Sequence, residues 1–282
     1  MADAGGTLQR LAAFTTLPDG GNPAGVWIGE TLPSVEEMQR IAAEVGYSET
    51  AFIAPGHGRQ RNIRYYSPEA EVPFCGHATI ATGVALGMAE GEGLFTLSST
   101  VGDIPVQIHN REGVVTASLT SVKPSQTIPH PSLLTASLNH LNWSENELDS
   151  IIAPVIAYAG AKHLVLSVKH KARLENLNYD FDALKSLMLE YELTTLQLIW
   201  RESNTTFHSR NPFPVGGVVE DPATGAAAAA LGGYLRDAGI IETPIEILIH
   251  QGVFMGRPSL IRVTIPENGG IVISGTAVVI NL

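Results

Sequence analysis

Hydrophobic and polar positions alternate along much of the chain, but two stretches are almost continuously apolar and rich in small residues. These stretches are residues 78–88 and 226–235. A helix that is apolar on every side has to be buried. Strands with alternating residues each present one apolar face that can cover such a helix. We therefore expect two buried helices, each enclosed by a curled sheet.

Short apolar or alternating runs on both sides of these stretches predict strands. In the first half of the chain the predicted strands are residues 8–14, 26–28, 50–54, 62–66, 94–98, 104–109 and 114–119. In the second half they are residues 196–200, a stretch ending at Phe207-His208, and residues 245–249, 260–265, 271–274 and 277–280.

Start and stop signals predict further helices. Ser34 stands three residues before Glu37, which is the pattern of a capping box, and the helix that it opens should end at Gly46. Residues 180–191 carry leucine and methionine on one helical face and predict another helix. Residues 144–147 form a second capping box and predict a helix there as well.

The elements of the two halves correspond at a constant offset. Cys75 and Asp221 are 146 residues apart (221 − 75), about half of the 282-residue chain. With the same offset, the predicted helix at residues 34–45 corresponds in sequence to the predicted helix at residues 180–191. Residue identity between the halves is slight, so we expect a structural duplication. The expected class is α+β, with two pseudo-symmetric domains that are each a curled, mainly antiparallel sheet around a central helix.

The domain boundaries follow from a stretch rich in Pro, Ser and Thr at residues 121–131. We expect an N-terminal domain at residues 1–120 and a C-terminal domain at 132–282. The closing C-terminal strand could pack back on the N-terminal domain.

Charge and composition exclude several classes of protein. The chain is 44% hydrophobic and 16% charged, which is typical of a globular protein with a sizeable core. Its net charge of −11 argues against nucleic acid or an anionic membrane as a partner, because both require basic patches. The single cysteine excludes an internal disulfide framework, and the first residues lack the pattern of a signal peptide. We therefore expect a cytoplasmic protein.

Two motifs, one in each half, each end a polar loop and begin one of the apolar stretches. They are Pro73-Phe74-Cys75-Gly76-His77-Ala78-Thr79 and Glu220-Asp221-Pro222-Ala223-Thr224-Gly225. Each places reactive side chains beside free backbone N–H groups at a helix N-terminus, where carboxylates and phosphates bind. The pair predicts a site for one small anionic substrate. No spacing of His or Cys predicts a metal site, and no glycine pattern predicts a nucleotide.

Five motifs occur in a fixed order from about Leu11 to the C-terminus: Gly21-Asn22-Pro23, Ser48-Glu49-Thr50-Ala51-Phe52, Cys75-Gly76-His77-Ala78-Thr79, Glu220-Asp221-Pro222-Ala223-Thr224-Gly225, and Gln251-Gly252 followed by Gly256-Arg257-Pro258-Ser259. Together they resemble the PhzF family, the phenazine-biosynthesis-like isomerases related to diaminopimelate epimerase. The resemblance implies the diaminopimelate epimerase-like fold, an active site between two similar domains, a homodimer and no cofactor.

The resemblance also implies the roles of particular residues. Glu49 matches the family's proton-transferring glutamate, and His77 and Asp221 match its two other central polar residues. The substrate would be bound around Asn22 and by the helix starts at Gly76, Gly225 and Ala226. Members of the phenazine pathway usually have serine where this chain has Ala226, which puts the particular substrate in doubt more than the reaction class.

Each of these residues also has a simpler interpretation. Glu49 could be a solvent-facing residue at a strand end, and a lone histidine such as His77 is more often structural than chemical. Asp221 before a proline is a favoured helix N-cap. Cys75 is best explained as a small buried residue that packs the loop. Without a second cysteine, a mechanism that uses two thiols is excluded.

Two alternatives for the function follow. The proton could return to the same carbon, as in an epimerase, or to another carbon, as in an allylic isomerase. A non-catalytic metabolite-binding or protein-interaction protein could also retain the fold, but the presence of Glu49 counts against that class.

Overall fold

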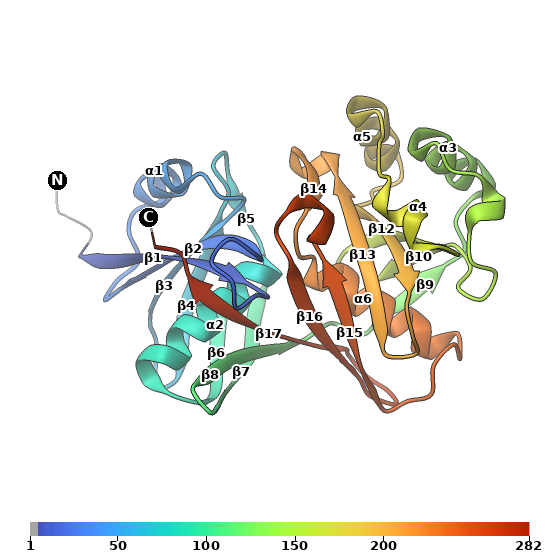
Figure 1. Ribbon diagram of the computed structural model, residues 1–282. Coiled ribbons are helices and arrows are strands. Elements are labelled where there is room, and N and C mark those ends of the chain that lie inside the picture. The colour runs from blue at the N-terminus through green and yellow to red at the C-terminus, as the bar shows by residue number, and fades with distance from the viewer. Residues whose placement is uncertain (1–4, 282) are drawn as a thin grey trace. The chain divides into compact units, whose positions relative to one another are not determined.

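The computed structural model describes residues 5–281, and the chain divides into two compact units (Figure 1). Unit 1 consists of residues 1–120 and 274–282, and unit 2 of residues 121–273. Residues 1–4, part of the N-terminal segment in which no signal peptide was found, lie outside the described residues. In the described part of the chain, no helix is both long enough and apolar enough to cross a membrane.

Eight strands of unit 1 form a closed barrel. The pairings pass from β1 through β2, β3, β4, β6, β7, β8 and β17 and return to β1. The β2–β3 and β4–β6 pairs are parallel. The β1–β2, β3–β4, β6–β7, β7–β8 and β1–β17 pairs are antiparallel. The strands, with the short β5 beside β4, are β1 (Gly6–Ala13), β2 (Asn22–Gly29), β3 (Thr50–Pro55), β4 (Gln60–Tyr66), β5 (Glu71–Val72), β6 (Gly93–Ser99), β7 (Gly102–Arg111), β8 (Val114–Thr120) and β17 (Val272–Val279).

Helix α2 (Gly76–Glu90) is the buried helix predicted for the first half. Every residue from His77 to Gly87 is buried, and the helix contacts β1, β2, β3, β7 and β8. The barrel approaches closely because two helix positions lack a side chain. A Cβ at Gly83 would lie 2.6 Å from that of Ala117, and one at Gly87 would lie 2.5 Å from Val115 Cγ1. The first-half prediction of a buried central helix is confirmed.

Unit 2 contains eight further strands, β9 to β16, and six helices or helical turns besides its central helix. Its strands are β9 (Ser125–Thr127), β10 (Val155–Tyr158), β11 (Lys162–Val168), β12 (Thr195–Arg201), β13 (Thr206–Phe213), β14 (Val218–Asp221), β15 (Ile245–Gln251) and β16 (Ser259–Ile265). The helices and helical turns other than the central one are α3 (Pro131–Leu141), η1 (Glu145–Glu147), α4 (Lys171–Glu175), α5 (Phe181–Glu190) and η2 (Pro214–Gly216), and the turn η3 (Val253–Met255) follows β15.

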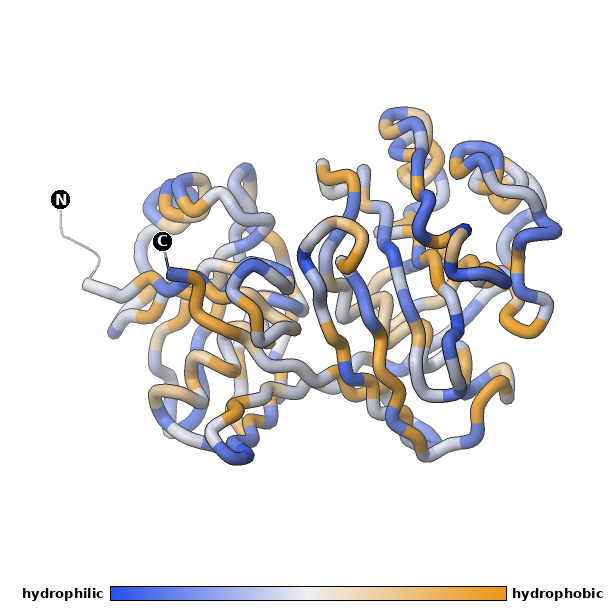
Figure 2. Tube along the Cα trace, viewed as in Figure 1, coloured by the Kyte–Doolittle hydropathy of each residue, from blue (hydrophilic) through white to orange (hydrophobic). Residues whose placement is uncertain are grey.

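Apart from β14, which pairs with β13, the strands of unit 2 pair in the order β9, β10, β11, β12, β13, β15 and β16. Helix α6 (Gly225–Asp237) packs on β9, β10, β11 and β16, and its residues 227–235 are all buried. The second predicted central helix is therefore also buried. The outer helices α3 and α5 instead alternate hydrophobic and hydrophilic residues along their turns, as Figure 2 shows.

A buried histidine lies in the core of unit 2. His163 on β11 is fully buried, and its Nδ1 lies 2.8 Å from Thr195 Oγ1 on the adjacent β12. Asn211 donates to the same hydroxyl oxygen at 3.1 Å. Burial lowers the pKa of His163 to about 3, so the ring is neutral in the folded protein at neutral pH.

We expect this histidine to make unit 2 less stable in acid. In the unfolded chain its pKa returns to about 6.5, so between that value and about 3 the unfolded state binds more protons. The free energy of unfolding then falls as the pH falls, by about 1.4 kcal/mol per pH unit from this residue. The free energy of unfolding is measured by urea titration at several pH values from 7 to 4. His163→Asn should remove this residue's contribution to its pH dependence, whereas His57→Asn, at an exposed position, should leave the pH dependence unchanged. Equal slopes in all three proteins would contradict this assignment.

The structure differs from the sequence prediction at the following three places, among others. The helix predicted at the second capping box is only the turn η1, although both of its capping bonds form; it stops because Leu148 pairs with Val168 in a β-bridge. The two predicted strands at 271–274 and 277–280 are the single strand β17. Gly275 does not break it, because its lack of a side chain makes room for Phe14, whose ring would lie 2.4 Å from a Cβ there. The presumed link at 121–131 contains β9.

Candidate active site

The start of helix α2 is held by a chain of hydroxyl groups beneath it. Thr79 Oγ1 donates to the carbonyl oxygen of Cys75 at 2.6 Å, so the Tyr65 hydroxyl, 2.7 Å from Thr79 Oγ1, is the donor in that contact. Tyr65 is buried on β4, and burial raises the pKa of its phenol. These bonds fix the first turn, whose initial N–H groups have no helical partner and receive no side-chain cap from Cys75.

Glu49 is placed by the strand that follows it. Helix α1 (Val35–Val45) ends at Gly46, whose φ of 70° is left-handed, and the chain then leads into β3. The Glu49 carbonyl accepts a hydrogen bond from the N–H of Gly25 on β2 at 3.2 Å. A side chain at Gly25 would collide with Thr50, 2.6 Å from its Cβ. The close parallel pairing of β2 and β3 therefore anchors the backbone that carries the carboxylate.

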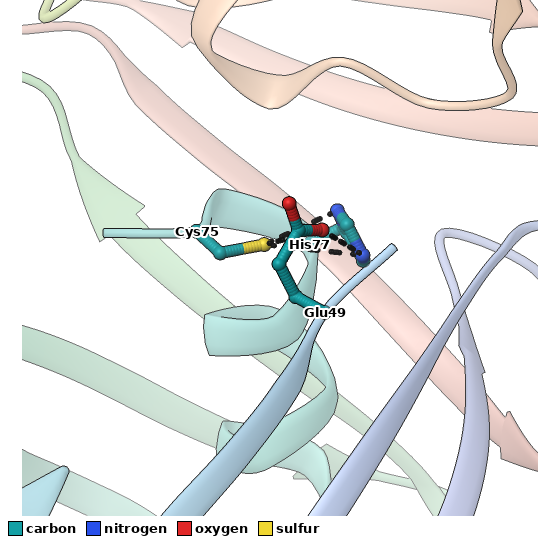
Figure 3. Close-up of side chains that lie close together, drawn as sticks. All are labelled: Glu49, Cys75 and His77. Atoms are coloured by element: carbon teal, nitrogen blue, oxygen red, sulfur yellow. Dashed lines mark hydrogen bonds and ion pairs between the residues drawn. The ribbon is translucent and has the colours of Figure 1, made fainter. Parts of the chain in front are cut away.

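The side chains of Glu49, Cys75 and His77 point toward one another at the start of α2 (Figure 3). Glu49 Oε2 lies 3.4 Å from His77 Nε2 and 3.5 Å from Cys75 Sγ. Cys75 Sγ lies 3.4 Å from His77 Nδ1, and Ser48 Oγ lies 3.4 Å from His77 Nε2. Because all of these groups can exchange protons, the cluster is suited to acid–base chemistry.

The three side chains differ in their access to solvent. Those of Cys75 and His77 are buried, whereas that of Glu49 is 20% exposed. Glu49 is thus the member of the cluster that a small molecule can reach most easily, while its neighbours hold it in place.

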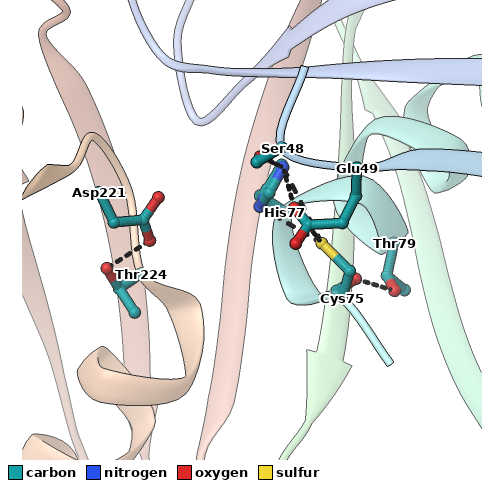
Figure 4. A network of polar contacts seen from close by, with 7 residues as sticks. All are labelled: Ser48, Glu49, Cys75, His77, Thr79, Asp221 and Thr224. Atoms are coloured by element: carbon teal, nitrogen blue, oxygen red, sulfur yellow. Dashed lines mark hydrogen bonds and ion pairs between the residues drawn. The ribbon is translucent and has the colours of Figure 1, made fainter. Parts of the chain in front are cut away.

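A second group of polar side chains lies within unit 2 at the start of α6, also drawn in Figure 4. Thr224 Oγ1 donates to Asp221 Oδ2 at 2.6 Å. The buried side chain of Gln251 on β15 contacts both residues: its Nε2 donates to the Asp221 carbonyl at 2.7 Å and to Thr224 Oγ1 at 3.0 Å, and its Oε1 accepts from the Thr224 N–H at 3.2 Å. Gln251 therefore fixes both the backbone and the side-chain direction of Asp221.

A family model described as phenazine biosynthesis-like protein (PhzC-PhzF) matches residues 11–281. The chain belongs to this family. A trans-2,3-dihydro-3-hydroxyanthranilate isomerase from Pseudomonas chlororaphis is 33% identical over 252 residues, which cover 89% of this chain and 87% of that relative. With this family and such relatives, the chain is an isomerase.

Solved structures agree with the PhzF-family assignment. A PhzF-family protein from Bacillus anthracis superimposes with a TM-score of 0.85 at 26% identity, covering 97% of this chain and 96% of that one. A hydroxyproline epimerase from Agrobacterium vitis has a TM-score of 0.65 at 13% identity, covering 97% and 90%. The latter similarity shows that the fold is one that epimerases also use.

The structure of this PhzF-family chain places the predicted residues in two groups. Glu49, Gly76 and His77 lie in unit 1, and Asp221, Gly225 and Ala226 lie in unit 2. Asn22 begins β2 and is only 2% exposed, so its side chain is part of the interior. The sequence indicates no role for Gln251, although Gln251-Gly252 belongs to the fifth motif.

We expect replacement of Gln251 to loosen this group. Gln251→Met keeps the size of the side chain but removes three hydrogen bonds, so a partly buried carbonyl and a partly buried N–H lose these partners. The free energy of unfolding should fall by about 2–4 kcal/mol, given roughly 1–3 kcal/mol for each unsatisfied buried group. Gln126→Met at an exposed position on β9 is the matched control. Equal urea midpoints for the two variants would show that Gln251 does not hold the loop.

A buried ion pair supports the same loop. Arg210 on β13 makes two hydrogen bonds to the Glu220 carboxylate, at 2.7 and 2.5 Å. The remaining donors of Arg210 reach the carbonyls of Leu174 and Glu175 at 3.3 and 2.8 Å. Glu220 directly precedes Asp221, so this pair fixes β14 where it leads into the α6 start. The sequence offered no signal for this pairing.

Proposed function

We propose that this isomerase moves a proton on a small carboxylate-bearing metabolite and that Glu49 carries the proton. The observation that supports this most strongly is the partly exposed Glu49 carboxylate held against His77 and Cys75, with Oε2 3.4 Å from His77 Nε2. A carboxylate so held can accept a proton from a substrate carbon and keep a fixed direction while it does so.

In the proposed reaction the Glu49 carboxylate removes a proton from an activated carbon. The electron pair of the broken C–H bond stays on the substrate, and Glu49 becomes a carboxylic acid. The Glu49 carboxylic acid, whose proton exchanges with solvent, then gives a proton to another carbon or to the opposite face of the first, which regenerates the carboxylate. Since the reaction only removes a proton from carbon and returns one, with no change of oxidation state, it requires no cofactor.

The other residues are proposed to hold the substrate. His77 and Asp221 would orient it and stabilise the charge that develops. The free N–H groups at the helix starts, those of Gly76 and His77 and those of Gly225 and Ala226, would bind its carboxylate.

The substrate class follows from the same features together with the relative. The Pseudomonas chlororaphis relative is named for trans-2,3-dihydro-3-hydroxyanthranilate, a carboxylate on a partly reduced ring. We propose a substrate of this general kind, an amino acid or a dihydroaromatic acid. Ala226 offers no hydroxyl at the α6 start, so the natural substrate need not be that compound.

The decisive experiment is solvent exchange in deuterium oxide across a panel of small amino acids and dihydroaromatic acids. Incorporation of deuterium at a substrate carbon, followed by NMR, would support proton transfer. Deuterium at the original carbon with inverted configuration indicates an epimerase, and deuterium at a new carbon indicates an allylic isomerase. Binding of a panel member without any incorporation would count against the proposed reaction.

A further inference from the structure

We propose that Glu49, Cys75 and His77 form a binding site for Zn²⁺, and that the bound ion stops proton transfer. Among the described residues, no other group of three or more His, Cys, Asp or Glu side chains brings its ligand atoms within 4.8 Å of one another. The spacing of His and Cys along the chain does not predict this site. The ligands come instead from a strand start and a helix start that the fold brings together.

The distances within the cluster fit a tetrahedral ion. Zinc binds nitrogen and oxygen at roughly 2.0–2.2 Å and sulfur at about 2.3 Å, so its tetrahedral ligands lie about 3.3–3.6 Å apart. Glu49 Oε2 lies 3.4 Å from His77 Nε2 and 3.5 Å from Cys75 Sγ. The third edge, from Cys75 Sγ to His77 Nε2, is 3.9 Å. A small rotation of one side chain would complete the geometry.

The chemistry of the three donors also favours zinc. Thiolate, imidazole and carboxylate are the three side-chain ligands of zinc in proteins, and three of them leave a fourth position for water. A thiolate and a carboxylate together balance the two positive charges of the ion. Two of the donors are buried on fixed backbone, so little ordering is needed on binding.

A zinc ion at this position would bond to the Glu49 oxygen that faces His77 and Cys75, leaving that carboxylate unable to take a proton from carbon. The inhibition therefore rests on the proposed function, whereas the metal site itself does not. Zinc binding should release a proton, because the Cys75 thiol must ionise.

The metal site is tested with the whole 282-residue chain in a phosphine reductant, which does not compete for the metal as a thiol would. Co²⁺ is added as a spectroscopic probe, and Zn²⁺ affinity is measured by competition with a chromophoric chelator. Because Cys75 is the single cysteine, a thiolate-to-cobalt charge-transfer band can arise from this residue alone. We expect that band, displacement by one Zn²⁺ per chain, and proton release.

Variants separate this site from adventitious surface binding. Cys75→Ser should abolish the band, and Cys75→Ser, Glu49→Gln and His77→Asn should each weaken Zn²⁺ binding roughly 100-fold or more, since loss of even an outer partner costs 10–100-fold. His57→Asn, at an exposed position outside the cluster, should bind as the wild type does. Circular dichroism confirms that each variant is folded.

The outcomes distinguish the two proposals. Absence of the cobalt band in the wild type, or Zn²⁺ affinity unchanged by Cys75→Ser and Glu49→Gln, would overturn the metal site, whatever the protein catalyses. A metal site that passes these tests while deuterium exchange proceeds at the same rate with saturating Zn²⁺ would overturn the inhibitory role. Failure of all substrates to exchange in metal-free protein would instead count against the proposed function alone.

Discussion

Glu49→Gln is expected to eliminate exchange of the substrate's C–H proton with solvent while the protein still folds and binds ligand. Glutamine keeps the shape of the side chain and its contacts with His77 and Cys75, but its amide cannot accept a proton from carbon. The loss should be at least the roughly 10²–10⁴-fold that a general acid–base group contributes. NMR of deuterium incorporation measures it directly.

Two further variants make that result specific to Glu49. Glu69→Gln changes an exposed glutamate in the same unit and should exchange at the wild-type rate. Asp221→Asn should lose less in exchange and more in substrate affinity, because its proposed role is to orient the substrate. A Glu49→Gln protein that exchanges at the wild-type rate would refute the mechanism, regardless of the family to which the chain belongs.

The two central helices could be predicted because their sequences leave no other arrangement. A helix with an all-round apolar sequence such as residues 78–88 has to be buried, and the alternating strands around it supply a sheet that covers it. The glycines in α2 are consistent with this burial, because the absence of side chains at Gly83 and Gly87 lets the barrel strands pack closely against the helix. Local pattern and tertiary packing agree there, so the local pattern was sufficient.

Prediction failed where a local signal competes with packing. The capping box at residues 144–147 is a genuine helix start, yet pairing of Leu148 with Val168 ends the helix after one turn. The composition of residues 121–131 predicts a linker, but Pro131 occupies the first turn of α3, where proline is favoured. Buried Leu133, Leu138 and Leu141 then dock that helix on the core of unit 2.

The candidate site was predictable residue by residue but not as a geometry. Motif matching pointed to Glu49 and His77, yet the contact of Cys75 with both depends on how β3 and α2 meet, and these are far apart in the sequence. Cys75 was interpreted as a packing residue; it is buried, but it also contacts the proposed proton carrier. The buried support around Asp221 likewise depends on strand register, which places Asn211 opposite Asp221 and Ser209 opposite Gln251.

Glu220→Gln is expected to lower the free energy of unfolding by about 3–5 kcal/mol, as removal of one partner from a buried ion pair typically does. The side chains of Arg210 and Glu220 are only 11% and 7% exposed, so solvent cannot replace the lost carboxylate. The guanidinium would keep its contacts with two carbonyls and with the ring of Phe254, 5.4 Å away, but its charge would have no counterion in that pair.

Two comparisons test whether the burial of this pair is the cause. Glu246→Gln breaks the exposed pair with Arg262, whose side chains are 44% and 50% exposed, and should cost only about 0–1 kcal/mol. The double variant Arg210→Met with Glu220→Met removes both charges and should recover most of the loss, because an apolar pair of similar size is often no less stable than a buried ion pair. Urea unfolding measures all three. If Glu220→Gln lowers the free energy of unfolding no more than Glu246→Gln does, the ion pair does not hold β14. The fixed position of Asp221 must then depend on Gln251 alone.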